Sequence, residues 1–188
     1  MIIPITTLWL PILISGILVF VLSSITHMFL SYHQNDFSKV PGEEGVMDAL
    51  RPFDVPPGDY VLPHGEGMEA MRSQEFQQKV AKGPNIIMTV VPAGGMLSMG
   101  PQLVQWFAFT LLAGIVSAYL GGRMLTPGTD YIQVFRVTGT VAFASYSMAL
   151  MQNSIWFHKR WSATLKSMFD GLMYAALTGG VFGWLWPI

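Results

Sequence analysis

The stretch ITTLWLPILISGILVFVLSSITHMFL, residues 5–30, decides the fold class, because it is long and apolar enough to cross a lipid bilayer as a helix. No lysine or arginine precedes Lys39, so the chain lacks the basic start of a signal peptide. Pro11 falls in the first turns, where a missing amide donor costs least. We therefore predict a retained membrane helix over residues 5–30.

Three further apolar stretches have the length of a membrane helix, and they cover residues 103–122, 134–156 and 168–186. Hydrophobic residues make up 52% of the chain and charged residues 11%, whereas soluble domains carry about 25% charged residues. Lipid must therefore cover much of the surface. We predict an all-α membrane protein, a single domain over residues 1–188 with four transmembrane helices.

Basic side chains indicate the orientation, since they concentrate on the cytoplasmic side of membrane proteins. The turn between the third and fourth stretches holds His158, Lys159, Arg160 and Lys166, whereas neither terminal tail holds a basic residue. With four crossings, this places both termini outside and residues 31–102 in the cytoplasm.

The polar segment at residues 31–102 has nine acidic and five basic side chains and is interrupted by many prolines and glycines. We predict helices at Glu43–Leu50 and Gln74–Lys82, the second capped by Ser73. Extended pieces at Asp59–Leu62 and Ile86–Val91 could pair in a small sheet, which gives an irregular α+β segment. The glycine- and proline-rich stretch at residues 85–101 is read as surface-lying, with a re-entrant loop as the alternative.

Small residues recur at helical spacing in the predicted crossings. Because the hydrophobic effect does not drive helices together in lipid, close backbone approach through small residues has to do so. The stripes are either packing faces of this chain's own bundle or a docking face for another subunit. The residues proposed for these faces are Gly114, Ala118, Gly122, Gly171, Ala175, Gly179 and Gly183.

Histidines at the cytoplasmic ends of the crossings suggest a metal or haem site. His27 and His33 lie at the end of the first crossing, and His158 at the end of the third. Two imidazoles with a carboxylate such as Asp36 could hold a metal ion, and two facing imidazoles could ligate haem. Interfacial histidines more often satisfy local hydrogen bonds, so no cofactor is predicted and the site is kept as an alternative. Asp170 is read as a helix-end residue.

No catalytic arrangement stands out in the sequence. Cysteine is absent, which excludes disulfides and thiolate chemistry, and the formal net charge of −1 gives no basic face for nucleic acid. We therefore predict a non-enzymatic accessory or structural subunit of a larger membrane complex, with other integral membrane subunits and lipid as its partners. The alternatives are a homo-oligomeric pore or small-solute transporter, and a haem- or metal-binding membrane protein.

Three motifs carry a family resemblance: HQND through PGEE (33–44), PGDYVLP (57–63) and FDGLMY through GWLWP (169–187). Together they resemble a group of uncharacterised bacterial membrane proteins of similar length. The resemblance implies the four-helix layout and a bacterial inner-membrane origin. It implies no activity.

Overall fold

The computed structural model describes residues 2–188. The chain separates into two compact units, one of Met1–Ser38 with Gly100–Ile188 and one of Lys39–Met99. We call them the helical unit and the inserted unit. Helices account for 68% of the chain, and a single two-stranded sheet completes the regular structure of the described residues, in agreement with the predicted mainly helical class.

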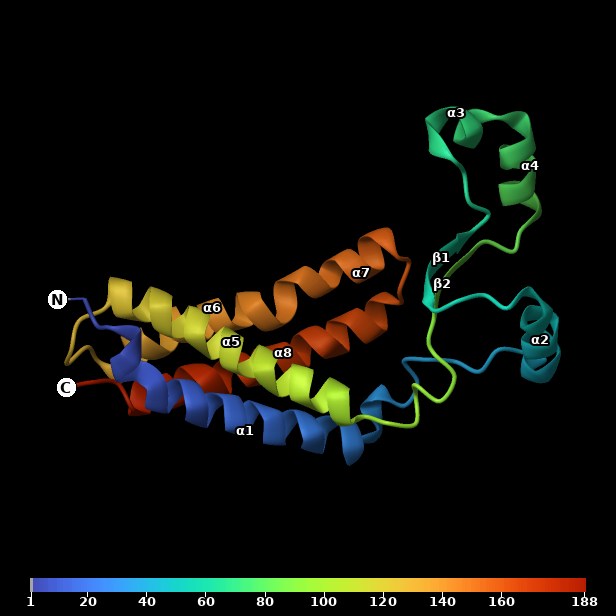
Figure 1. The fold of residues 1–188 in the computed structure, drawn as a ribbon. Coiled ribbons are helices and arrows are strands. Elements are labelled where there is room, and N and C mark those ends of the chain that lie inside the picture. The colour runs from blue at the N-terminus through green and yellow to red at the C-terminus, as the bar shows by residue number, and fades with distance from the viewer. Residues whose placement is uncertain (1) are drawn as a thin grey trace. The chain divides into compact units, whose positions relative to one another are not determined.

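The helical unit is a bundle whose long helices run side by side (Figure 1). Its helices are α1 (Trp9–Met28), α5 (Gly100–Met124), α6 (Tyr131–Ser147), α7 (Met151–Trp156) and α8 (Trp161–Trp184). A 3₁₀ turn, η1 (Ile5–Leu8), precedes α1, and another, η4 (Met148–Leu150), separates α6 from α7. The predicted crossing at residues 134–156 is therefore interrupted at η4, which the sequence did not indicate.

Three segments among residues 2–188 are long and apolar enough to cross a membrane: Ile5–Met28, Gly100–Met124 and Tyr131–Trp156. They correspond to the first three predicted crossings. The fourth predicted crossing, residues 168–186, corresponds to α8, which ends at Trp184. This helix is long enough to cross a membrane, but its mean hydropathy is too low for it to count as a candidate span. Glycines and Asp170 dilute the apolar content of this helix. The structure therefore supports a membrane protein with three candidate spans.

Small residues let the helices approach closely. A Cβ atom added at Gly179 of α8 would lie 2.9 Å from the Phe135 carbonyl oxygen and 3.1 Å from Gly139 Cα on α6. A Cβ atom at Gly122 of α5 would lie 2.6 Å from the carbonyl oxygen of Ile3. Because these neighbours are backbone atoms, they cannot move aside as a flexible side chain could. Glycine is thus required at these contacts.

Both described ends of the chain lie at the same end of the helical unit (Figure 1). The amide of Ile3 donates to the Gly122 carbonyl at 2.9 Å, and the amide of Gly128 donates to the Pro187 carbonyl at 2.9 Å. Trp186 packs in the same buried cluster as Ile3 and donates its indole N–H to the Thr126 carbonyl. The opposite end carries the candidate site described below.

The inserted unit confirms several local predictions. Its elements are α2 (Glu43–Leu50), η3 (Arg51–Phe53), β1 (Gly58–Leu62), α3 (Gly67–Arg72), α4 (Gln74–Lys82) and β2 (Ile86–Val90). Helices α2 and α4 have the predicted bounds, and the Ser73 hydroxyl accepts from the Phe76 amide as the expected cap. Strands β1 and β2 pair antiparallel, with Tyr60 opposite Met88. Helix α3 was not predicted.

Candidate functional site

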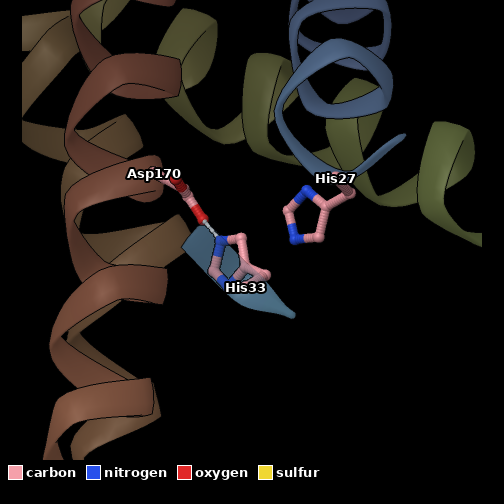
Figure 2. A group of neighbouring side chains, drawn as sticks. All are labelled: His27, His33 and Asp170. Carbon is pink, nitrogen blue, oxygen red and sulfur yellow. Dashed lines mark hydrogen bonds and ion pairs between the residues drawn. The ribbon is translucent and has the colours of Figure 1, made fainter. Parts of the chain in front are cut away.

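Three potential metal ligands meet at one end of the helical unit. His27 lies in the last turn of α1, His33 ends the 3₁₀ turn η2 (Ser31–His33), and Asp170 lies in the third turn of α8. One ligand atom from each residue falls within 4.8 Å of the other two. Figure 2 shows the His33 ring between the Asp170 carboxylate and the His27 ring. Residues more than 130 positions apart therefore form one cluster.

His33 is held at both ring nitrogens. Its Nδ1 lies 2.6 Å from Asp36 Oδ2, and its Nε2 lies 2.7 Å from Asp170 Oδ2. A carboxylate on Nδ1 fixes the orientation of the ring and raises the basicity of Nε2, an arrangement common behind metal-binding histidines. Asp36 is thus placed to orient the His33 ring, as the outer hydrogen-bond partner of a metal ligand does.

His27 is held by its own helix. Its Nδ1 lies 3.0 Å from the Ser23 carbonyl oxygen and 3.1 Å from the Thr26 hydroxyl. A carbonyl can only accept, so Nδ1 carries the hydrogen and Nε2 keeps its lone pair. The ring stacks on His33 with centroids 4.6 Å apart and planes 10° apart. Nε2 of His27 is therefore available as a ligand beside His33.

Asp170 is buried, with 2% of its surface exposed. Its Oδ1 accepts from the Tyr32 hydroxyl and its Oδ2 from His33. Lys166, one turn earlier in α8, donates to the Tyr32 carbonyl at 2.6 Å and to Asp36 Oδ1 at 2.8 Å. The side chains of α8 and of the η2 segment are therefore joined through one polar network.

The charges in this network favour the ionised form of Asp36. Burial opposes ionisation of Asp36, but hydrogen bonds from Lys166 and His33, together with their charges, outweigh it and hold the pKa of this carboxyl below its usual range. Asp36 thus stays anionic near neutral pH and keeps accepting from His33 Nδ1.

The structure brings together three of the four residues that the sequence suggested for a metal or haem site. His27, His33 and Asp36 lie in the network, whereas His158 lies in the turn between α7 and α8 and lines a separate cavity. Asp170 was read as a helix-end residue and is instead a central member. It is the one acidic residue of α8, and this was the signal that could have identified it.

The proposed helix-packing residues all lie in contacts inside the helical unit. Gly114 meets Ile12 of α1, Gly171 meets Ser147, and Gly183 meets Tyr131. Ala118 and Ala175 are buried. Both small-residue faces of α5 are covered, one by α1 and the N-terminal segment and the other, at Gly121, by side chains of α6 and the C-terminal segment.

Two imidazole nitrogens and one carboxylate oxygen are a ligand set for divalent transition metals such as Zn²⁺, Fe²⁺, Co²⁺ and Ni²⁺. Haem held between the two histidines fits less well. A porphyrin between axial ligands needs the rings apart and pointing at a common iron, whereas these rings are stacked face to face. The geometry therefore favours a single ion.

No family model, curated protein or solved structure matches the chain. The resemblance to bacterial membrane proteins therefore stays a prediction, and the function has to be argued from the site itself.

Proposed function

We propose that the protein is an integral membrane protein that binds one divalent transition-metal ion between His27, His33 and Asp170 at one end of its helical bundle. The observation that carries the proposal is the convergence of three ligand atoms within 4.8 Å, contributed by α1, η2 and α8. Ionisable side chains at the edge of a membrane bundle are functional-site candidates, and these three form a ligand set with a known chemistry.

The surroundings of the ligands support this proposal. Each imidazole has its Nδ1 engaged, by the Ser23 carbonyl for His27 and by Asp36 for His33, so that Nε2 is the nitrogen that each ring can offer to an ion. Such outer contacts accompany most metal-bound histidines. Lys166 bonds to Asp36 and not to Asp170, so it leaves the carboxylate ligand free of a competing ammonium group.

Binding requires a small rearrangement. Metal–ligand bonds of about 2.0–2.1 Å hold the ligand atoms of a shared ion roughly 3–3.5 Å apart. His33 Nε2 and Asp170 Oδ2, 2.7 Å apart, are already close enough, since an ion can replace the proton that they share. His27 is the most exposed of the three residues and must turn out of its stack on His33 to direct Nε2 at the ion.

Metal content and metal titration test the proposal. We expect the purified full-length chain in mild detergent to bind one Co²⁺ or Zn²⁺ per chain, measured by elemental analysis after desalting and by the visible absorption of Co²⁺. The double variant His27→Gln with His33→Gln should lose this binding, because both nitrogen ligands are removed.

A matched control is available because the chain has four histidines. His64→Gln with His158→Asn removes the other two and should leave the stoichiometry at one; asparagine suits the positive φ of 54° at His158. Substoichiometric metal in the wild-type chain, or equal binding by the two double variants, would overturn the proposal.

We further propose that α8 is a fourth crossing, which places both termini outside and the metal site on the cytoplasmic side. Support comes from the close packing of α8 on α6 at Gly179 and from the neighbouring positions of the two chain ends. The basic turn after α7 supports the orientation. The bacterial inner membrane is the compartment that the family resemblance implies.

Single-cysteine labelling tests this layout cleanly, since the chain has no cysteine of its own. In intact cells, a membrane-impermeant maleimide should label Asp130→Cys and Ile188→Cys and should spare Lys159→Cys until the cells are opened. If α8 instead lay on the cytoplasmic surface, Ile188→Cys would be protected like Lys159→Cys.

The other functions suggested by the sequence have less in their favour. Docking of another subunit rested on a surplus of small-residue faces on α5, and both faces are occupied within the bundle. A pore needs polar groups along a path through the bilayer. Thr138 and Ser145 of α6 are hydroxyl residues that could line such a path, but both donate to carbonyls of their own helix. Metal binding is therefore the function that we propose.

A further inference from the structure

A second polar feature lies at the same end of the helical unit as the metal site. It is a cavity of about 370 Å³ between the segment that follows η2 and the turn from α7 to α8. Its polar wall comes from three consecutive residues of that turn, His158, Lys159 and Arg160, and from Asn153. Phe37, Leu150 and Ala163 form an apolar wall. The cavity is thus amphipathic.

The positive charges on this cavity are uncompensated. Among the described residues, neither Lys159 nor Arg160 takes part in an ion pair. The single acidic side chain in the lining is Asp36, which is already bonded to Lys166 and His33. The cavity therefore presents a net positive field to a ligand, and an anion complements it.

The backbone of the turn holds the basic residues over the cavity. His158 has a φ of 54°, which turns the chain back so that the Lys159 amide donates to the Asn153 carbonyl at 3.2 Å. Arg160 is the N-cap residue of α8, and its carbonyl accepts from the Ala163 and Thr164 amides. A defined turn therefore sets the backbone positions of Lys159 and Arg160.

The tryptophans around the turn indicate its position relative to lipid. Trp156 ends a candidate membrane span with 72% of its surface exposed, and Trp161 begins α8 with 48% exposed. Exposed tryptophans are enriched at the level of lipid headgroups. A cavity lined by the turn between these two tryptophans would be reached by lipid headgroups as well as by small anions from water.

We propose that this cavity binds the phosphate-bearing headgroup of an anionic phospholipid. Lys159 and Arg160 would hold the phosphate, with Asn153 as an additional polar contact, and the apolar wall at Phe37 and Leu150 would cover the start of an acyl chain. The apolar wall and the flanking tryptophans favour a lipid over a free phosphate compound. The proposal involves residues other than the metal ligands and does not depend on metal binding.

Lipid retention measured by native mass spectrometry tests the proposal on the full chain. We expect the wild type to bind phosphatidylglycerol in preference to phosphatidylcholine. The variant Lys159→Gln with Arg160→Gln should lower the affinity for phosphatidylglycerol by roughly 30-fold, because each basic side chain at a membrane surface contributes roughly fivefold. Both residues are exposed, so the fold should be unaffected, which circular dichroism can verify.

A control variant removes the same charges elsewhere. Arg72→Gln with Lys82→Gln lies on exposed helices of the inserted unit and should change the affinity less than twofold. Glycerol 3-phosphate is the soluble probe, and it should not displace bound phosphatidylglycerol at millimolar concentration. Equal binding of the two lipids, equal losses in the two double variants, or displacement by glycerol 3-phosphate would each overturn the lipid proposal.

Discussion

Replacing Gly179 with alanine is expected to destabilise the helical bundle by about 1–3 kcal/mol, the usual cost of forcing an extra methyl group into a filled contact. The added Cβ would lie 2.9 Å from the Phe135 carbonyl oxygen and 3.1 Å from Gly139 Cα, so α6 and α8 would have to separate. The better helix propensity of alanine offsets up to about 1 kcal/mol of this cost. Unfolding in mixed micelles with rising SDS, followed by circular dichroism, measures the change.

The adjacent glycine provides the control. A Cβ atom at Gly180 would meet only the Tyr131 hydroxyl, at 3.4 Å, which is an ordinary contact. Gly180→Ala should therefore gain the helix-propensity term of roughly 0.5–1 kcal/mol without a clash. If Gly179→Ala were as stable as Gly180→Ala, the close approach of α6 and α8 would not be what holds the bundle together.

Replacing Asp170 with asparagine is expected to weaken metal binding by more than roughly 100-fold, beyond the range known for outer contacts, because it removes the one charged ligand. Asparagine has nearly the same shape and can still accept from the Tyr32 hydroxyl, so the variant should fold. Competition for Zn²⁺ with a chromophoric chelator measures the affinity. This prediction rests on the proposed metal site.

Asp36 has a different role in the same site, and the size of its effect should show it. Asp36→Asn leaves all three ligands in place but weakens the hold on His33 Nδ1, so we expect a loss of about 10–100-fold with the stoichiometry unchanged. Asp130→Asn, at the other end of the bundle, should have no effect. A loss as large as that of Asp170→Asn would make Asp36 a ligand and contradict its role as an orienting partner.

Local sequence signals were sufficient for most of the secondary structure. Helix α4 begins and ends as predicted because Ser73 supplies a cap and Gly83 stops the helix. The 3₁₀ interruption at η4 could not be read in the same way, since no proline or glycine marks it. It lies where Ser147, just before it, packs against Gly171 of α8, which is a tertiary contact.

The candidate site was only half accessible to sequence reasoning. His27, His33 and Asp36 are close in sequence, and histidines at the end of an apolar stretch are candidate metal ligands. Asp170 is 137 residues from His33, and only the packing of α8 beside α1 brings it into place. The sequence position of a polar residue indicates how deep in the membrane it lies. Its hydrogen-bond partners depend on which helices pack together, and the sequence does not give this.

The two small-residue faces of α5 show the same limit. Their spacing predicted surfaces suited to close approach, but a linear pattern carries no information on which segments pack against them. Gly114 and Gly122 pack against α1 and the N-terminal segment, and Gly121 packs against Thr138 and Trp186. Contacts with two other segments of the same chain therefore account for the second small-residue face of α5.

The stack of His27 on His33 implies that the ligand shell of the proposed metal site is only partly preorganised. His33 and Asp170 are fixed by hydrogen bonds before an ion arrives, whereas His27 has to give up its ring contact to complete the chelate. An ion with weak preference for nitrogen, such as Mg²⁺ or Ca²⁺, gains too little from a third, imidazole ligand to offset that change. In the proposed metal site, the conformation of this one side chain would therefore discriminate between abundant hard cations and scarce softer ones.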